Sequence, residues 1–456
     1  MAVSAIFSVQ NNLRPSSVSL PILAESGAEA SPYTQYVYGY PHKTAYRALS
    51  APIALSDLWK PEDQRALSLY VHVPFCEMRC GFCNLFTTTN SDHTLEDRYL
   101  DAVERQARAT RAALSSAHFA NVALGGGTPT WLSPKQLERV FAMLETMFSI
   151  ANVPIGVETS PQTATADRLT VLKDHKTTRV SIGVQSFFDD ESKAIGRPQS
   201  RAVVEAALER LRAAAFETLN IDLIYGIPGQ TTHTWLASIR AALKYQPEEL
   251  YLYPLYVRPL TGMAKTAREW DDERQVRYRE GRDLLLSEGY TQRSMRMFER
   301  NGSKRPDSTY ACQRDAMVGL GCGARSYTTS VHYSEEWAVA SKSVRDILQS
   351  YIARGESDFS SARYGFVLDT HEQLRRHALL LLLTQEGLDE CAFYQRFHSS
   401  LETAIDSIAP MMTEQLIERR GQHLVLTERG LALSDLVGPR LFSPNVLQLM
   451  SEFSLR

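Results

Sequence analysis

The sequence predicts an α/β protein, in which six strand and helix units form a partial barrel and a mostly helical, winged-helix-like domain follows. From residue 67 onward, short apolar segments that suit buried parallel strands alternate with longer segments of helical period. Polar motifs follow several of these apolar segments directly. Because parallel α/β sheets bind ligands at the carboxyl ends of their strands, this coincidence favours one barrel with its site at that edge.

Six short segments rich in Val, Ile, Leu and Tyr are expected to be the strands. They are residues 67–73, 121–126, 154–159, 179–184, 218–225 and 249–256. Helical period predicts helices between them, for example over 94–114 and 133–148. After residue 260 the alternation weakens, and we expect a charged helix over 269–288 and a strand entering a Gly-rich loop over 317–328.

The same patterns divide the chain into four parts. We expect an N-terminal extension over 1–64, the core barrel over 65–260, a barrel extension on the substrate side over 261–362 and a C-terminal domain over 363–456. Within the last part, residues 416–437 suggest a helix, a hairpin about Gly421 and a helix opened by Thr427, as in a winged helix. Its mixed charge favours a packing role over DNA binding.

Composition and charge exclude several classes of protein. Hydrophobic residues make up 44% of the chain and charged residues 22%, as in a globular protein. The net charge is −3 without a long block of one sign, so we expect a small-molecule partner and no nucleic acid. The longest apolar run, 378–383, is too short to cross a membrane, and the first thirty residues lack a secretory pattern. We therefore expect a cytoplasmic protein.

Three of the six cysteines lie in the segment HVPFCEMRCGFCN. Three thiolates as close as Cys76, Cys80 and Cys83 can hold zinc or an iron-sulfur cluster. Structural zinc usually takes two separated pairs, and His72 as a fourth ligand would give an unusual spacing. A 4Fe-4S cluster held by three cysteines leaves one iron able to bind a substrate or cofactor, and the pattern favours this alternative. The other cysteines are expected to be small buried side chains: Cys312, Cys322 and Cys391.

Residues suited to ligand binding follow the later strands. GGGTPT (125–130) comes after the second strand, where glycines let backbone groups approach a ligand closely. Glu158, Gln185 and Asp222 stand at or just after the ends of three later strands, and their oxygens suit an amine and ribose hydroxyls. The planar guanidinium of Arg197 could pair with a carboxylate. Any one of these residues could simply lie on an exposed loop, but their occurrence together favours a single binding site at the strand ends.

These motifs carry a family resemblance. LYVHVPFCEMRCGFC, GGGTPT, RVSIGVQSF, IGR and NIDLIYGIPGQT stand in the order and approximate spacing of the HemN and HemW group, the oxygen-independent coproporphyrinogen III oxidase-like radical S-adenosylmethionine (SAM) proteins. The chain resembles this group strongly over about 65–260 and more loosely over 317–327 and the C-terminal domain. The resemblance implies that a 4Fe-4S cluster reduces SAM, and that the resulting 5′-deoxyadenosyl radical abstracts hydrogen from a substrate.

Carried over by position, the resemblance also implies the site residues. Cys76, Cys80 and Cys83 would bind the cluster, and Tyr70 and Phe82 would line it. The SAM contacts would be Gly126, Gly127, Thr128, Glu158, Gln185, Arg197 and Asp222, with Tyr256 near the adenine. Some members hold a second SAM, and GLGCGAR (319–325) falls where that loop would lie. The partners implied are a small molecule such as a tetrapyrrole and an electron donor of the flavodoxin or ferredoxin type.

Two positions depart from the family pattern. Leu85 stands where the decarboxylating oxidase has a further cysteine, which argues against conversion of coproporphyrinogen. PDSTYA (306–311) stands where haem chaperones have a His-Asn-x-x-Tyr-Trp motif; Tyr310 matches, but the histidine is absent. Three functions stay open: a radical SAM oxidoreductase or methyltransferase, a tetrapyrrole-binding chaperone on the same scaffold, and an iron-sulfur protein without catalysis.

Two further patterns have more than one interpretation. In RSMRMF (293–298), the arginines could meet an anionic substrate, or they could alternate as exposed charges with buried methionines on a strand. The tyrosines at 251, 253 and 256 are expected to fill the core, with Tyr256 as the exception.

Overall fold

The body of the protein is one mixed sheet of 13 strands. The computed structural model describes residues 33, 36, 37, 39–265, 273–303 and 316–455. In spatial order the strands are β1 (Arg47–Ala54), β15 (Ser361–Val367), β14 (Val331–Ser334), β13 (Arg325–Tyr327), β12 (Met317–Leu320), β2 (Leu67–Val73), β5 (Phe119–Gly126), β6 (Ile155–Thr159), β7 (Arg179–Gln185), β8 (Thr218–Tyr225), β9 (Glu249–Pro254), β11 (Met297–Arg300) and β10 (Tyr290–Gln292).

The strands from β12 to β9 in this order run parallel. The six predicted strands are β2, β5, β6, β7, β8 and β9, so the α/β barrel fold class is confirmed. β12 adds a further parallel strand beside β2, and it carries the predicted strand that leads into the Gly-rich loop. The carboxyl ends of these strands therefore meet at one edge of the sheet.

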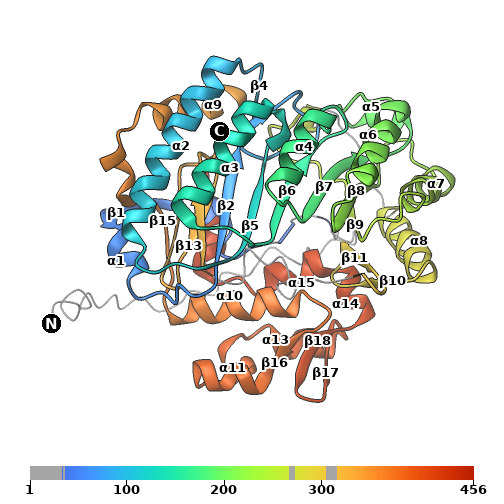
Figure 1. Ribbon diagram of the computed structural model, residues 1–456. Coiled ribbons are helices and arrows are strands. Elements are labelled where there is room, and N and C mark those ends of the chain that lie inside the picture. The colour runs from blue at the N-terminus through green and yellow to red at the C-terminus, as the bar shows by residue number, and fades with distance from the viewer. Residues whose placement is uncertain (1–32, 34–35, 38, 266–272, 304–315, 456) are drawn as a thin grey trace.

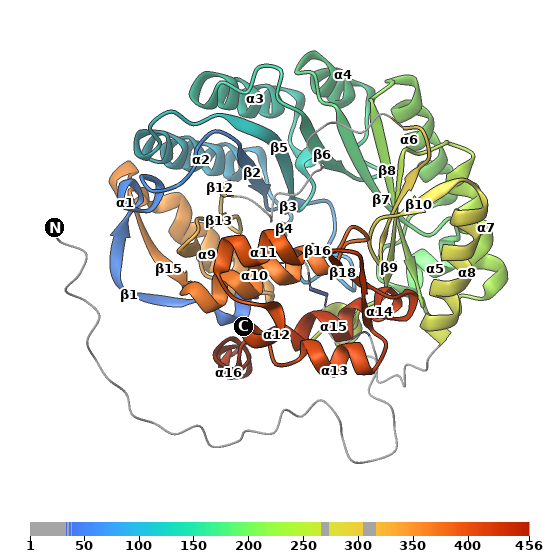
Figure 2. The same cartoon turned by 90° about the horizontal axis from the view of Figure 1, so that it is seen from below.

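Helices cover the outer face of the curved sheet. Figure 2 shows the strands as an arc with these helices outside it and with the C-terminal elements, in orange and red, across its open side. The helices of the barrel are α2 (His93–Ala113), α3 (Pro134–Phe148), α4 (Ala166–Asp174), α5 (Asp189–Ala194), α6 (Arg201–Ala213), α7 (Thr232–Leu243) and α8 (Glu273–Ser287), as labelled in Figure 1.

Local sequence explains where these helices begin. α3 starts with a capping box, because the Ser133 hydroxyl accepts from the Gln136 backbone N–H over 3.3 Å and the Gln136 side chain accepts from the Ser133 N–H over 3.0 Å. Pro134 occupies the first helical position, which needs no N–H donor. α2 is capped in the same sense by Asp92, whose carboxylate accepts from Leu95 N–H over 2.7 Å. Both helices were predicted within one residue at their starts.

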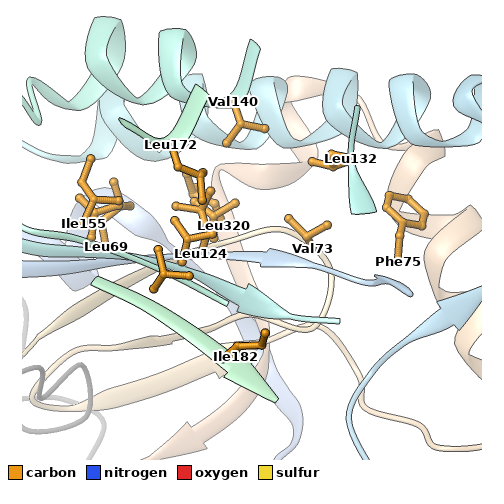
Figure 3. Packing of buried hydrophobic residues seen from close by; sticks show 14 of the residues in the cluster. Leu69, Val73, Phe75, Leu124, Leu132, Val140, Ile155, Leu172, Ile182 and Leu320 are labelled. Atoms are coloured by element: carbon orange, nitrogen blue, oxygen red, sulfur yellow. The ribbon is translucent and has the colours of Figure 1, made fainter. Parts of the chain in front are cut away.

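Apolar side chains between the sheet and the helices form the main core. Figure 3 shows Leu69 and Leu124 on neighbouring strands facing Val140 and Leu172, which come from α3 and α4. Each of these side chains is at most 3% exposed. Burial of such a side chain contributes about 1.5–3 kcal/mol relative to exposure, so this layer holds the strand ends in place.

The C-terminal domain packs around a second core. Its helices are α10 (Thr370–Leu382), α11 (Glu390–Phe397), α12 (Leu401–Ala404), α13 (Ile408–Thr413), α14 (Glu428–Ala432), α15 (Ser434–Arg440) and α16 (Pro444–Glu452). A small antiparallel sheet in the order β16 (Leu388–Asp389), β18 (His423–Leu426), β17 (Ile417–Arg420) completes it. This helical domain with its hairpin has the predicted winged-helix-like character.

The hairpin itself was predicted correctly, but the element before it was not. Gly421 has a φ of 62°, which glycine adopts without strain, and Thr427 caps α14. Residues 417–420 form a strand and not a helix. Ile417 is buried and pairs with Leu426, and all four residues of 417–420 pair with β18, which makes this segment the outer strand of the small sheet.

The N-terminal residues are integrated into the fold. β1 pairs antiparallel with β15, and α1 (Leu55–Trp59) follows it. Tyr40 and Tyr46 belong to the C-terminal core, whereas Trp59 belongs to the main core. The four-part division of the chain stays a prediction. Within the ranges described, none of the helices combines the length and the apolar character that a bilayer crossing requires.

Candidate active site

The three predicted cluster cysteines lie on one loop at the carboxyl end of β2. The loop begins at Cys76, the last residue of β3 (Phe75–Cys76), and ends at β4 (Thr88–Thr89), with which β3 pairs in parallel. Backbone hydrogen bonds fix its middle, because Gly81 N–H donates to the Ile195 carbonyl over 2.9 Å and Met263 N–H donates to the Gly81 carbonyl over 2.9 Å. A Cβ on Gly81 would lie 2.7 Å from the Ile195 oxygen, so the approach requires glycine.

His72 ties the far end of the loop to β2. Its Nε2 lies 2.9 Å from the carbonyl oxygen of Phe86, and its Nδ1 lies 3.2 Å from the Tyr70 hydroxyl. Because a carbonyl only accepts, Nε2 carries the proton and Nδ1 accepts from Tyr70. Burial lowers the pKa of His72 to about 4, which keeps the ring neutral. With both ring nitrogens engaged, His72 holds the loop and is not a fourth metal ligand.

Two side chains donate hydrogen bonds to the cysteine sulfurs. Arg197 Nη1 lies 3.0 Å from Cys80 Sγ, and Thr128 Oγ1 lies 3.7 Å from Cys76 Sγ. Burial, followed by the neighbouring Cys83, raises the pKa of the Cys76 thiol to about 12. Burial also raises the pKa of Cys83. Thiolates in this loop therefore need a positively charged centre, and a bound metal centre supplies that charge.

The arrangement of the donors bears on which metal centre fits. Among residues that the structure describes, no three His, Cys, Asp or Glu side chains converge as ligands of a single ion. The three cysteines nevertheless line one cavity. In an iron-sulfur cube each cysteine binds a different iron, so the sulfurs need not converge as they do around zinc. Three cysteines on one cavity wall can therefore hold an iron-sulfur cube.

All of the predicted site residues line one cavity with a volume of about 540 Å³. They are Tyr70, Cys76, Cys80, Phe82, Cys83, Gly126, Gly127, Thr128, Glu158, Gln185, Arg197, Asp222 and Tyr256. These residues span positions 70 to 256 of the sequence, a stretch of 187 residues. They meet at one place because the carboxyl ends of the parallel strands share one edge of the sheet. The roles of the individual residues stay predictions.

The glycine motif lies directly against the cysteine loop. Gly127 N–H donates to the Val73 carbonyl over 2.7 Å, and Thr128 N–H donates to the Phe75 carbonyl over 2.8 Å. Gly126 has a φ of 109°, a conformation that favours glycine. A Cβ on Gly127 would lie 2.6 Å from the Phe75 oxygen. The glycines therefore allow the end of β5 to pack against the strand that enters the loop.

Two carboxyl groups with raised pKa values line the cavity. Glu158 Oε2 accepts from Gly126 N–H over 3.1 Å, and burial raises the pKa of Glu158 to about 7. Asp222 accepts from the Asn220 amide over 2.7 Å, and burial raises its pKa to about 6. A ligand with an ammonium group or hydroxyls would favour the ionised forms, and both groups could then accept hydrogen bonds from it.

Gln185 and Arg197 are held by the end of β7. Gln185 has a φ of 69°, a left-handed conformation that costs energy in a residue other than glycine. Arg197 Nη2 donates to the Gly183 carbonyl over 2.9 Å and its Nε donates to Gln199 over 3.2 Å. Together with the bond to Cys80, every nitrogen of the guanidinium has a protein acceptor. Each Nη atom carries a second N–H, so the predicted pairing of Arg197 with a carboxylate is compatible with these three bonds.

One tyrosine of β9 lies on the cavity wall instead of in the core. Tyr253 lines the cavity as Tyr256 does, although it was expected to fill the core. The Tyr256 hydroxyl donates to Asp435 and accepts from Arg296. The Tyr256 ring stacks on Tyr36, with centroids 6.3 Å apart and an angle of 15° between the planes. Tyr256 lies beyond the end of β9 and three positions after Tyr253, so strand alternation could not have placed both residues on one wall.

Both interpretations of RSMRMF need correction. Arg296 is 6% exposed and pairs with Asp435, so it is neither a surface charge nor a residue of the cavity wall. Arg293 pairs with Glu299 over 2.7 Å. Met295 is buried, as one interpretation expected. The partner of Arg296 is remote in sequence, and for this reason the pattern alone was misleading.

Four basic side chains of the cavity wall were missed by sequence reasoning: His42, Lys43, Arg258 and Arg325. The first two come from the predicted N-terminal extension, for which no site residue was expected. After burial, the charges of the other three residues lower the pKa of His42, so all three lie near it. Sequence periodicity does not reveal this convergence, because the four residues come from three separate parts of the chain.

The structure places some of the remaining cysteines and of the positions that depart from the family pattern, while others lie outside the described residues. Cys322 is buried as expected, but Cys391 is exposed, because α11 turns Phe393 and not Cys391 toward the core. Cys312 and the segment 306–311, with Tyr310, lie outside the described residues. Leu85 lines the cavity and is 42% exposed.

Comparison with known proteins gives the same assignment as the geometry. Residues 70–242 match the model of the radical SAM superfamily, and residues 368–433 match the model of the HemN C-terminal domain. The chain is 30% identical over 395 residues to an oxygen-independent coproporphyrinogen III oxidase of Cereibacter sphaeroides, covering 82% of this chain and 85% of the oxidase. It is 27% identical over 377 residues to the heme chaperone HemW of Bacillus subtilis, covering 81% and 97%.

The solved structure of HemN from Escherichia coli, a coproporphyrinogen III oxidase, has the same fold. The TM-score is 0.76 at 23% identity, and the match covers 92% of this chain and 98% of that one. The expected resemblance is therefore confirmed over the barrel and the C-terminal domain. The chain belongs to the HemN and HemW family of radical SAM proteins.

Proposed function

We propose that this protein is a radical SAM enzyme that starts its reaction by hydrogen abstraction from an organic substrate bearing carboxylates, with a tetrapyrrole as the favoured class. The observation that carries this proposal is the shared cavity, where the cysteine loop, the glycine motif and two carboxyl groups meet. The cluster and SAM, when bound, supply one electron and the nucleotide radical that removes hydrogen. The protein residues bind and orient these groups.

Each wall of the cavity has its own part in this proposal. Cys76, Cys80 and Cys83 would hold the cluster, and Tyr70 and Phe82 would limit solvent access to it. The backbone at Gly126 to Thr128 would approach the methionine part of SAM closely, because no side chain intervenes. Gln185, Arg197 and Asp222 would meet its polar groups.

Glu158 has a further property that suits a cationic ligand. Its carboxyl is held next to the Gly126 backbone, and burial raises its pKa to about 7. An ammonium group at this position would favour the ionised carboxylate, so binding would release a proton from Glu158 near neutral pH. The ligand would thus gain an ion pair with Glu158 on the cavity wall.

The basic wall supports a substrate with carboxylates. Lys43 and Arg325 lie close enough to His42 to lower its pKa, and Lys43 is only 8% exposed. The His42 Nδ1 accepts from Thr44 N–H over 3.3 Å, so the neutral ring carries its proton on Nε2 as a further donor. Like charges this close repel one another, and a bound anion offsets that repulsion.

The cavity also offers flat apolar surfaces beside the basic wall. Tyr327 and Trp337 line it, and Lys43 Nζ lies 3.7 Å from the centroid of the Trp337 ring. A volume of about 540 Å³ is within the range of about 300–1,000 Å³ typical of small-molecule sites. The oxidase among the relatives is named for coproporphyrinogen, a tetrapyrrole, which supports this class.

The decisive experiment is anaerobic turnover. Protein reconstituted with iron and sulfide, reduced with dithionite and given SAM should form 5′-deoxyadenosine, whereas Cys83→Ala should not. Reconstituted wild-type protein that carries a 4Fe-4S cluster but forms no 5′-deoxyadenosine, with or without a tetrapyrrole, would refute the enzyme proposal.

A heme chaperone is the second candidate, because the match to HemW spans 97% of that protein. A chaperone would bind haem, seen as a Soret band, and pass it on without consuming SAM. An enzyme would consume SAM in proportion to substrate. Measuring both quantities in the same sample separates the two functions.

Two accessory proposals follow from the family assignment. We propose that a flavodoxin- or ferredoxin-type protein supplies the electron, which replacement of dithionite by such a donor tests. We also propose a second SAM beside the Gly-rich loop, because Gly323 and Arg325 of this loop line the same cavity. Equilibrium dialysis should then give two SAM per chain, and one SAM per chain would refute it.

A further inference from the structure

A buried ion pair joins the barrel to the C-terminal domain. Arg296 precedes β11, and Asp435 lies in the first turn of α15. Arg296 Nη2 lies 2.5 Å from Asp435 Oδ1, and the two residues are 6% and 1% exposed. A charge this deep is costly unless its partner is present, so the pair requires the C-terminal domain to be docked.

The same pair holds a residue of the ligand cavity. The Tyr256 hydroxyl donates to the second carboxylate oxygen of Asp435 and accepts from Arg296. Because its hydroxyl is engaged in this way, Tyr256 can meet a ligand only through its ring. The position of that ring at the cavity wall therefore depends on Asp435.

A third segment is fixed at the same point. The guanidinium of Arg296 lies 4.1 Å from the centroid of the Tyr36 ring, and Tyr36 stacks on Tyr256. Tyr36 also lies on the cavity wall, and it contacts Tyr253 edge to face with centroids 6.0 Å apart. The N-terminal residues, the barrel and the C-terminal domain thus meet around Arg296.

We propose that Asp435 is a positioning residue of the SAM cavity. It holds the Tyr256 hydroxyl and Arg296, and through them it sets the rings of Tyr256 and Tyr36 on the wall. This inference rests on the proposed SAM site. By thermodynamic reciprocity, a ligand that needs these rings in place also strengthens docking of the C-terminal domain.

The test is a mutant cycle with SAM affinity as its readout. In the reconstituted, reduced full-length protein, the SAM concentration that gives half of the SAM-induced change in the cluster EPR signal measures affinity. Asp435→Asn should raise this concentration about fivefold or more. Glu428→Gln is the matched control, because Glu428 forms an exposed ion pair with Arg282 over 2.6 Å between the same two domains. It should leave the midpoint unchanged.

A combination of substitutions tests whether Asp435 affects SAM affinity through the Tyr256 hydroxyl. Tyr256→Phe removes the hydroxyl but leaves the ion pair, and in this background Asp435→Asn should raise the midpoint less than it does alone. An equal effect in both backgrounds would show that Asp435 acts by another route and would overturn the proposal. A purely structural role would lower thermal stability without this non-additivity.

A second variant tests the proposal even if Asp435→Asn does not fold. Arg296→Met together with Asp435→Leu replaces both charges by apolar groups, which proteins often tolerate. This double variant should fold and show the same raised midpoint, and a wild-type midpoint would overturn the proposal. If the wild-type signal itself ignores SAM, the SAM site is refuted together with this role. A normal wild-type response with an unchanged midpoint in Asp435→Asn refutes the role of Asp435 alone.

Discussion

Arg197 donates a hydrogen bond to the sulfur of Cys80 over 3.0 Å, although the two residues are 117 positions apart in the sequence. The same guanidinium donates to the Gly183 carbonyl at the end of β7. The positive charge is therefore held rigidly beside one of the cysteines that would bind the cluster. Positive charge and hydrogen bonds at cluster sulfurs favour the reduced state, because reduction adds negative charge.

We expect Arg197→Ala to make the reduction potential of the reconstituted cluster more negative, by tens of millivolts. Arg197→Lys should give an intermediate value, since it keeps the charge but loses the planar geometry. Potentiometric titration followed by EPR measures the effect. Arg201→Ala, which removes an exposed arginine paired with Glu205, is the control. A potential identical to wild type in Arg197→Ala would contradict the prediction.

Gly127→Ala should disrupt the contact between the glycine motif and the cysteine loop. The new Cβ would lie 2.6 Å from the Phe75 oxygen and 2.8 Å from the Val73 oxygen, so the backbone must shift. We expect a loss of about 1–3 kcal/mol in the free energy of unfolding and a lower iron content after reconstitution.

Gly156→Ala is the matched substitution in the neighbouring strand β6. Its nearest atoms would be 3.9 Å and 4.0 Å away, and we expect a change within about 0.5 kcal/mol. Urea unfolding and iron analysis of both variants test the pair. Equal effects of the two substitutions would show that the close approach at Gly127 is unimportant.

Glu158→Gln should stabilise the protein without ligands at high pH. The pKa of Glu158 is 4.5 in the unfolded reference and about 7 in the fold, because burial disfavours the charge. Below pH 4.5 the group is protonated in both states and costs nothing. Between pH 4.5 and 7 the unfolded state loses its proton first, so the free energy of unfolding falls, and above pH 7 it stays lower.

The substitution removes this loss, so the two proteins should differ in the free energy of unfolding above pH 7 and hardly at all at pH 4. Urea unfolding at several pH values measures it. Asp222→Asn should show the same sign, with its change between pH 3.8 and about 6. A stability difference for Glu158→Gln that does not vary with pH would contradict this reasoning.

His72→Phe should loosen the far end of the cysteine loop. Phenylalanine fills a similar volume but leaves the buried Phe86 carbonyl without its donor, at a cost of about 1–3 kcal/mol. We expect faster loss of the reconstituted cluster in the presence of a chelator, followed by its visible absorbance. His93→Ala, at a side chain that is 79% exposed, should lose the cluster at the wild-type rate.

Local pattern was sufficient to predict the strands and the edge at which the site lies. The apolar segments of the barrel are buried strands, and the polar residues at their ends face one cavity, because parallel strands share an edge. Glu158 and Asp222 were found in this way. Tyr253 was not, because an aromatic residue on a strand packs in a core more often than on a ligand wall.

Long-range partners account for the remaining differences. Arg296 looked like an exposed charge, since its partner Asp435 lies 139 positions away in another domain. His42 and Lys43 reach the cavity wall from an N-terminal segment whose path no periodicity describes. Such placements depend on how domains dock, and this information is absent from any local window of sequence.

The pairing of β1 with β15 affects how the protein can be shortened. β1 is the first strand of the sheet and pairs with β15 through backbone hydrogen bonds. In the sequence it precedes the motifs of the family. A version of the chain that starts at residue 65 would leave β15 with unpaired N–H and C=O groups facing solvent. Open strands of this kind recruit other chains, so such a truncation would favour aggregation during expression.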